Sequence, residues 1–141
     1  MSTPTGTLTA DDLEFLGRPL HGFLTVAQGP QPPQPRPVWF EATAEGTIQL
    51  ATEPESLKVR RLRRDARASI VIAAPAEEPA RWLSVTGRTT VVPDEGHDLT
   101  ARLAGRYWDL DDPAHADDLA GLLTTDQVRV VIHPEKVSRF V

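Results

Sequence analysis

The sequence predicts a mainly β fold with peripheral helices, in which an antiparallel sheet forms a barrel. Two observations predict it. Short runs of β-branched and aromatic residues recur along the 141 residues, separated by turn-forming glycine and proline. Most neighbouring runs are also close enough to pair as hairpins, and only a few helical patterns lie between them. Hairpin-linked strands with a few interspersed helices are typical of an antiparallel barrel.

The elements of the first half follow from local signals. Thr9 is placed to cap a helix over residues 11–16. Residues 22–27 are rich in strand-forming side chains and predict the first strand. The proline-rich residues 28–37 are expected to be an exposed loop, because proline lacks the N–H donor that a helix or central strand needs.

A hairpin and a helix come next. Residues 38–43 and 47–52 are predicted as two strands joined by a tight turn that contains glycine. A helix is predicted over residues 56–64. Residues 68–73 are almost entirely apolar, which predicts a central strand buried on both faces.

The second half adds a long strand, two helices and the closing strands. Residues 81–92 form the strand, in which Gly87 indicates a bulge or a close backbone approach. An apolar stripe that ends at Tyr107 predicts a helix over residues 97–108. An acidic loop and a short helix over residues 117–123 are predicted next. Strands at 127–132 and 136–141 are predicted to close the chain. The total is six or seven strands.

The composition excludes several classes of protein. There is no cysteine, so disulfides, thiolate zinc sites and a cysteine nucleophile are excluded. The four histidines lack metal-ligand spacing, so no metal site is expected. The N-terminus lacks signal-peptide features, and no apolar run reaches the roughly 18 residues of a membrane span. We expect a cytoplasmic protein without membrane contact, with a flexible N-terminus at residues 1–9 and a single domain over 10–141.

Positive charge is concentrated in residues 58–67, which hold six basic side chains and one acidic side chain. This segment carries +5, so the rest of the chain must carry −10 to give the total of −5. A protein that binds long nucleic acids spreads its basic side chains over a broad surface. The concentration therefore favours a small anionic ligand, and a nucleic-acid-associated protein that uses these arginines stays open as an alternative.

The start of the helix near residue 56 has the features of a phosphate site. Unpaired N–H groups and the positive end of the dipole attract anions at a helix N-terminus. Ser56 can cap this end, and Lys58 in the first turn can reach the same anion. The arginines of residues 60–64 have a second interpretation as a solvated helix face, with Arg61 paired to Asp65.

Three segments, in this order, resemble the flavin-binding split-barrel family related to pyridoxamine 5′-phosphate oxidase. They are Pro37-Val-Trp-Phe-Glu41 with the strand at 48–52, Ser56-Leu-Lys58 running into residues 62–71, and Arg81-Trp-Leu-Ser-Val-Thr-Gly-Arg88. The resemblance extends over about residues 10–140. The second and third segments look most like the actinobacterial branch that uses the deazaflavin coenzyme F-420, whereas other members use FMN.

The resemblance implies a six-stranded antiparallel split β-barrel that forms a homodimer and holds its cofactor at the subunit interface. It implies that Ser56 and Lys58 meet the cofactor's phosphate, with Leu57 between them. The other positions that we assign to cofactor binding are Val38, Trp39 and Phe40 beside the ring, Ala51 and Thr52 at the strand end, and Arg60 and Arg61 on the helix. FMN oxidases often place arginine directly before the lysine, so Leu57 argues against pyridoxamine phosphate oxidase activity itself.

The resemblance implies an oxidoreductase that transfers a hydride between reduced F-420, with FMN as the alternative, and a small conjugated organic substrate. Hydride transfer is the cofactor's own chemistry, so we assign no catalytic residue, and solvent can supply the proton. The alternative from another class is a protein of this fold that holds a flavin, deazaflavin or haem-type ligand without turnover. We expect the loop at 28–37 to flank the mouth of the site and to influence substrate access, rather than to act as an SH3-type ligand.

Overall fold

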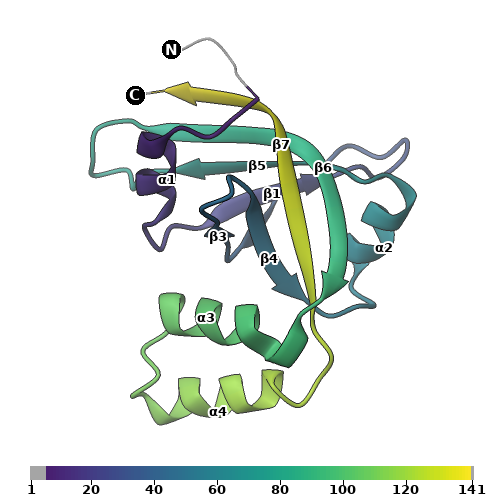
Figure 1. Cartoon of the computed structure of the whole chain (residues 1–141), viewed down its shortest axis with the longest axis vertical. Helices are drawn as coiled ribbons and strands as arrows, with labels where there is room; N and C mark the ends of the chain where they lie inside the picture. The colour runs from purple at the N-terminus through teal and green to yellow at the C-terminus, as the bar shows by residue number, and fades with distance from the viewer. Residues whose placement is uncertain (1–5, 141) are drawn as a thin grey trace.

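The structure, a computed structural model, describes residues 6–140 and contains an antiparallel sheet of seven strands with helices at its periphery (Figure 1). The strands are β1 (Gly22–Val26), β2 (Arg36–Val38), β3 (Glu41–Ala42), β4 (Ile48–Thr52), β5 (Arg67–Ala73), β6 (Trp82–Pro93) and β7 (Val128–Phe140). The helices are α1 (Ala10–Leu16), α2 (Leu57–Arg64), α3 (Asp98–Tyr107) and α4 (Pro113–Leu122), with the short 3-10 helix η1 (Glu95–His97) before α3. The mainly β prediction is confirmed, while the first five residues of the expected flexible terminus lie outside the described residues.

The sheet has seven strands, which agrees with the six or seven counted along the sequence and is one more than the six that the resemblance implies. The order is β2-β1-β5-β6-β7-β4-β3, and residues 38–43, expected to form one strand, are divided between β2 and β3 at opposite edges. Trp39 and Phe40 cross from one edge to the other. Within residues 6–140 no backbone ladder joins β2 to β3, so the curled sheet is a barrel that stays split along this line.

The long strands β6 and β7 run through both halves of the sheet and bend with it (Figure 1). Their register shifts between Thr86 and Gly87, which confirms the irregularity expected at this glycine. A Cβ atom at Gly87 would overlap the carbonyl oxygen of His133 on β7. The two closing strands predicted for the end of the chain are therefore one continuous strand, because the bulge lets the ladder bend without a loop.

The hydrophobic core fills the inner side of the curled sheet. Alternate residues of the strands point inward, and Leu24, Ile70, Val85 and Ile132 are among the buried side chains. The expectation that residues 68–73 are buried on both faces is wrong. Burial alternates along β5, and Val71 on its outer face is 37% exposed.

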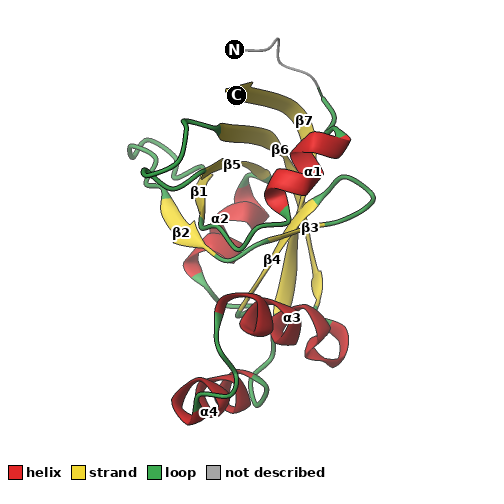
Figure 2. Cartoon of the chain, turned by 90° about the vertical axis from the view of Figure 1, so that its left-hand side faces the viewer, coloured by secondary structure: helices red, strands yellow, loops and turns green. Residues whose placement is uncertain are grey.

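Three helices in the described part of the chain begin at a side chain that caps the first turn. Thr9 forms a reciprocal capping box on α1, as predicted, and Ser56 caps α2. Asp112 caps α4, so this helix begins before the expected residue 117, with Pro113 in its favoured first-turn position. Figure 2 shows α3 and α4 together at one end of the molecule, away from α1. No helix among the described residues is long and apolar enough to cross a membrane.

We predict that Gly87→Ala destabilises the protein by about 2–3 kcal/mol, because the added methyl group forces the β6 and β7 backbones apart. The matched control is Gly121→Ala on α4, where the new Cβ meets open space and alanine is the better helix former. Urea unfolding measures both. Equal stability of Gly87→Ala and the wild-type protein would contradict the close approach.

Candidate functional site

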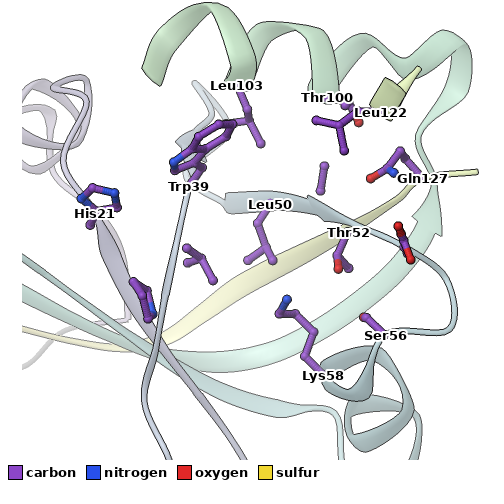
Figure 3. A pocket seen from close by; sticks show the side chains of 14 residues that line it. His21, Trp39, Leu50, Thr52, Ser56, Lys58, Thr100, Leu103, Leu122 and Gln127 are labelled. Atoms are coloured by element: carbon purple, nitrogen blue, oxygen red, sulfur yellow. The ribbon is translucent and has the colours of Figure 1, made fainter. Parts of the chain in front are cut away.

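A cavity of about 510 Å³ lies between the ends of β2 and β4, the start of α2 and helix α3 (Figure 3). Its lining residues are His21, Pro37, Val38, Trp39, Leu50, Ala51, Thr52, Glu53, Ser56, Lys58, Thr100, Leu103, Leu122 and Gln127. The wall is mixed, with apolar side chains along the middle and hydroxyl, amide and charged groups around them. Such a composition suits a ligand with an apolar body and a few polar attachment points.

The structure brings together six of the ten residues assigned to cofactor binding. Those that line the cavity are Val38, Trp39, Ala51, Thr52, Ser56 and Lys58. The remaining four lie elsewhere: Phe40 is 0% exposed in the core, and Leu57, Arg60 and Arg61 line cavities on the outer side of α2. At 0% exposure, Phe40 presents neither its side chain nor its backbone to a ligand.

The start of α2 forms the cationic end of the cavity. Ser56 accepts a hydrogen bond from the Val59 N–H at 3.4 Å, which leaves its O–H group available as a donor. Lys58 is partly buried and extends its ammonium group from α2 toward the cavity (Figure 3). Within residues 6–140 this ammonium has no hydrogen bond and no ion pair, and burial lowers its pKa. A bound anion would supply the counter-charge that Lys58 lacks.

Trp39 belongs to an aromatic wall at the other end of the cavity. Its ring stacks on Tyr107 of α3, with the ring centres 5.1 Å apart and the planes at 2°, and meets Trp108 edge-on at 4.7 Å. The Tyr107 hydroxyl donates to the Leu20 carbonyl oxygen at 2.6 Å. Tyr107 therefore continues the apolar stripe of α3, as predicted, and also supports the residue that forms the cavity wall.

A buried carboxylate holds the third side of the cavity. Asp94 accepts hydrogen bonds from the N–H groups of Leu99 and Thr100 at 3.0 and 2.9 Å, and from the Thr100 hydroxyl at 2.7 Å. Arg129 of β7 donates its Nε–H to the same carboxylate at 2.9 Å. Burial raises the pKa of Asp94, but the hydrogen bonds from Thr100, Leu99 and Arg129 outweigh it, and the pKa is lowered. Asp94 thus fixes Thr100, and with it the start of α3, against the sheet.

Two further cavities continue from the first along the outer side of α2. The second cavity, of about 350 Å³, shares the lining residue Lys58 with the first cavity. The third cavity, of about 610 Å³, shares the lining residue Arg61 with the second. The expected loop ends before residue 36, where β2 begins; Gln28, Gly29 and Pro30 of the loop line the larger of these cavities, and Gln34 of the loop with Arg36 and Pro37 of β2 lines the smaller. We call this path the arginine groove, and its cations are Arg36, Lys58, Arg60, Arg61, Arg64 and Arg67.

The alternative pairing of Arg61 with Asp65 is wrong. Asp65 instead binds Arg67, whose Nη2 lies 2.6 Å from Oδ2, and this hydrogen bond lowers the pKa of Asp65 to about 2. Arg61 has no ion pair within the part of the chain that the structure describes. It therefore stays available to an anion in the arginine groove.

Sequence patterns did not identify several residues that line the cavity. His21 was noted in the sequence only as one of four histidines without metal-ligand spacing; it is exposed directly before β1, and its side chain also lines the cavity. Thr100 and Gln127 reach the cavity through the placement of α3 and β7, which no local pattern encodes. Leu103 gave a signal as part of an amphipathic stripe, but a stripe does not distinguish a core contact from a cavity wall.

The comparison with protein-family models matches residues 8–137 to the family described as pyridoxamine 5′-phosphate oxidase. The chain therefore belongs to this family of split barrels, which contains oxidoreductases. A comparison with curated proteins finds no match.

Solved structures with the same fold support this assignment. An F-420 reductase is 26% identical, with a TM-score of 0.71, and the match covers 89% of this chain and 94% of that one. A conserved hypothetical protein from Mycobacterium tuberculosis is 20% identical, with a TM-score of 0.74 and coverage of 99% and 89%. A FAD-binding protein from Mesorhizobium loti is 19% identical, with a TM-score of 0.62 and coverage of 98% and 97%. The last two show the fold alone.

We predict that Asp94→Asn lowers the free energy of unfolding by about 2–3 kcal/mol at neutral pH, because the charge-assisted bond from Arg129 is lost. The folded-state pKa of Asp94 is lowered, so its stabilisation is present above the ordinary value of 3.8 and is lost as the pH falls through the lowered value. The difference between variant and wild type should therefore shrink below about pH 4. Denaturant unfolding across pH measures this, with Asp118→Asn on the exposed side of α4 as the control. A difference that persists unchanged in acid would contradict it.

Proposed function

We propose that the chain binds the deazaflavin F-420 in this cavity, with FMN as the alternative, and uses it to reduce a small conjugated organic substrate. The observation that carries the proposal is the Lys58 ammonium, which has no partner within residues 6–140 and lies beside the capped start of α2. It is at one end of a cavity that has an aromatic wall at the other. A cofactor of this class supplies the hydride when it is bound. The residues of the protein would hold and orient the cofactor and the substrate, and would shield them from water.

The residues at the start of α2 are suited to hold the phosphate. Lys58 provides a cation, Ser56 an O–H donor, and the first turn of the helix contributes N–H groups and the positive end of its dipole. Thr52 at the end of β4 adds a hydroxyl at the same end of the cavity.

The strand β2 and its continuation are suited to hold a planar ring. β2 lies at the edge of the sheet, so one side of its backbone has no ladder partner and can exchange hydrogen bonds with a heterocycle. Val38 and Trp39 line the cavity from this segment, and Leu50 and Ala51 line it from β4. These groups combine apolar contact with backbone polarity, as a flavin-like ring requires.

The arginine groove favours F-420 over FMN. Both carry a phosphate, but F-420 also carries an acidic tail that FMN lacks. A phosphate needs only the cations near Lys58, whereas the groove continues past Arg61 to Arg60 and Arg64. The similarity to an F-420 reductase at 26% identity and the leucine at position 57 support the same choice.

We further propose that the protein acts as a homodimer with the cofactor at the subunit interface. The outer face of the sheet carries an apolar patch in which Phe23, Val71 and Phe140 are 44%, 37% and 38% exposed. Phe23 pairs directly with Val71, and Trp82 stacks on Phe140 with ring centres 6.3 Å apart. A second copy is the occupant that would cover a patch of this kind.

We predict that the wild-type protein quenches or shifts the fluorescence of F-420 on binding and oxidises reduced F-420 faster than the background rate when a cyclic enone is present. Anaerobic titration followed by stopped-flow absorbance tests both steps, with FMN in parallel. Binding without turnover across a broad enone panel would favour the alternative of a non-catalytic binding protein, and absence of binding to both cofactors would overturn the proposal.

Within this test, Lys58→Ala should weaken cofactor affinity about 10- to 100-fold, because a charge-assisted hydrogen bond is worth about 1.5–3 kcal/mol. Lys136 on β7 is exposed and lies outside the cavity, so Lys136→Ala is the matched control. Unchanged affinity in Lys58→Ala would remove the phosphate assignment.

We also predict that Arg61→Ala weakens the binding of F-420 several-fold, an effect that grows at low salt, and leaves the binding of FMN unchanged. Arg63→Ala is the control, since Arg63 is exposed on the same helix but does not line the arginine groove. Titration of each variant with both cofactors at two salt concentrations gives the comparison. An equal loss of affinity for F-420 and FMN would show that the arginine groove does not bind the acidic tail.

A further inference from the structure

We propose that His21 donates the proton that accompanies hydride transfer in this cavity, and that Tyr107 is the residue that positions it. This inference rests on the proposed function. A hydride that adds to the β-carbon of an enone moves the alkene electron pair onto the carbonyl, and the resulting enolate must then take up one proton. The imidazolium of His21 gives that proton, becomes neutral, and is protonated again by water. The product is a saturated carbonyl compound, with the cofactor oxidised by two electrons.

The chemistry of the cavity wall singles out His21. The titratable side chains that line the cavity are His21, Glu53 and Lys58. A histidine ring ordinarily holds an exchangeable proton near neutral pH, whereas a glutamate is ordinarily ionised and a lysine ordinarily keeps its proton. His21 is therefore the side chain of this set that is suited to general-acid catalysis at neutral pH.

The position of His21 fits this role. Figure 3 shows His21 and Trp39 at one end of the cavity and Ser56 and Lys58 at the other. A phosphate held at Lys58 leaves the opposite end to the ring and the substrate. His21 is exposed, so water can return the proton after each turnover.

Tyr107 fixes His21 in two ways. Its hydroxyl donates to the carbonyl oxygen of Leu20, the residue directly before His21, at 2.6 Å. Its ring lies 5.9 Å from the His21 ring at an angle of 39°, while it stacks on Trp39 at 5.1 Å. One side chain thus sets the separation between the proposed acid and the aromatic wall against which a planar substrate would lie.

The charges around His21 are known from the elements that pack near it. Arg106 of α3 places its Cζ atom 5.5 Å from the centre of the Tyr107 ring and binds the carbonyl oxygens at the end of α1. Lys58 and Glu53 line the same cavity from the other side.

The other three histidines serve as internal comparisons. The ring of His97 contacts the Thr125 carbonyl oxygen, that of His115 stacks on Trp108, and that of His133 contacts the Thr90 hydroxyl. Within residues 6–140, the ring nitrogens of His21 have no hydrogen-bond partner. They are therefore available to a substrate and to water.

The test compares His21→Gln with wild type, using reduced F-420 and cyclohex-2-enone, with His133→Gln as the matched control. We expect kcat to fall about 100-fold or more in His21→Gln, with affinity for reduced F-420 unchanged. The wild-type rate should decline as the pH rises and imidazolium is lost, and this alkaline limb should be absent in His21→Gln. Added imidazole should restore part of the rate to His21→Ala. Tyr107→Phe, which retains the ring, should lower kcat less and keep the alkaline limb.

Three results separate the possibilities. A His21→Gln rate within about threefold of wild type, with the same pH profile, overturns the inference and assigns the proton to solvent. A change confined to KM also overturns it, because His21 would then be only part of the wall. A wild-type protein that binds reduced F-420 but never oxidises it overturns the proposed function itself, and the inference with it.

Discussion

The crossing of Trp39 and Phe40 between the two edges of the sheet is the constraint on which the rest of the structure depends. β2 pairs with β1 at one edge and β3 pairs with β4 at the other, so these two residues have no strand partner in the part of the chain that the structure describes. Phe40 turns into the core, and the Tyr107 hydroxyl lies 3.4 Å from both its N and its O atoms. Trp39 then faces the cavity. Trp39, one of the two residues that connect the sheet edges, therefore becomes part of the aromatic wall of the site.

The net charge of this protein does not indicate the charge of its ligand, whereas the position of the basic side chains does. The chain carries −5, yet four of the five basic side chains of α2 line the arginine groove, and the helix N-terminus borders the cavity. Many of the remaining arginines are used within the fold: Arg139 binds Asp12 at 2.7 Å, Arg102 binds Glu41 at 2.9 Å, and Arg129 binds Asp94. The cations of α2 differ because the acids that would neutralise them are distributed elsewhere. The anion site that we propose thus depends on one helix whose basic side chains have no ion pair within residues 6–140.

Local patterns predicted the cationic end of the site but not its other sides. Thr52, Ser56 and Lys58 lie within seven residues of strand, turn and helix, so their proximity follows from chain connectivity. Thr100 reaches the cavity because Asp94 binds the start of α3 to Arg129 on β7, and this contact joins residues 35 positions apart. The division of residues 38–43 into two strands was missed for the same reason, since alternation along a strand does not reveal which edge its end will join. The periodicity of the sequence predicts which side chains are buried. Which residues line the cavity depends instead on how the strands and helices are arranged.

The two ends of the cavity meet only because the sheet curls. β1 and β4 are separated by β5, β6 and β7 in the ladder order, so in a flat sheet the start of β1 and the end of β4 would lie far apart. The bulge at Gly87 and the length of β6 and β7 bend the sheet until its edges face each other, and Thr100 and Leu103 of α3 line the cavity between them. His21 before β1 and Lys58 after β4 then line one space. A closed barrel would fill this opening with a strand ladder, so the split between the sheet edges is also what leaves room for the planar cofactor that we propose.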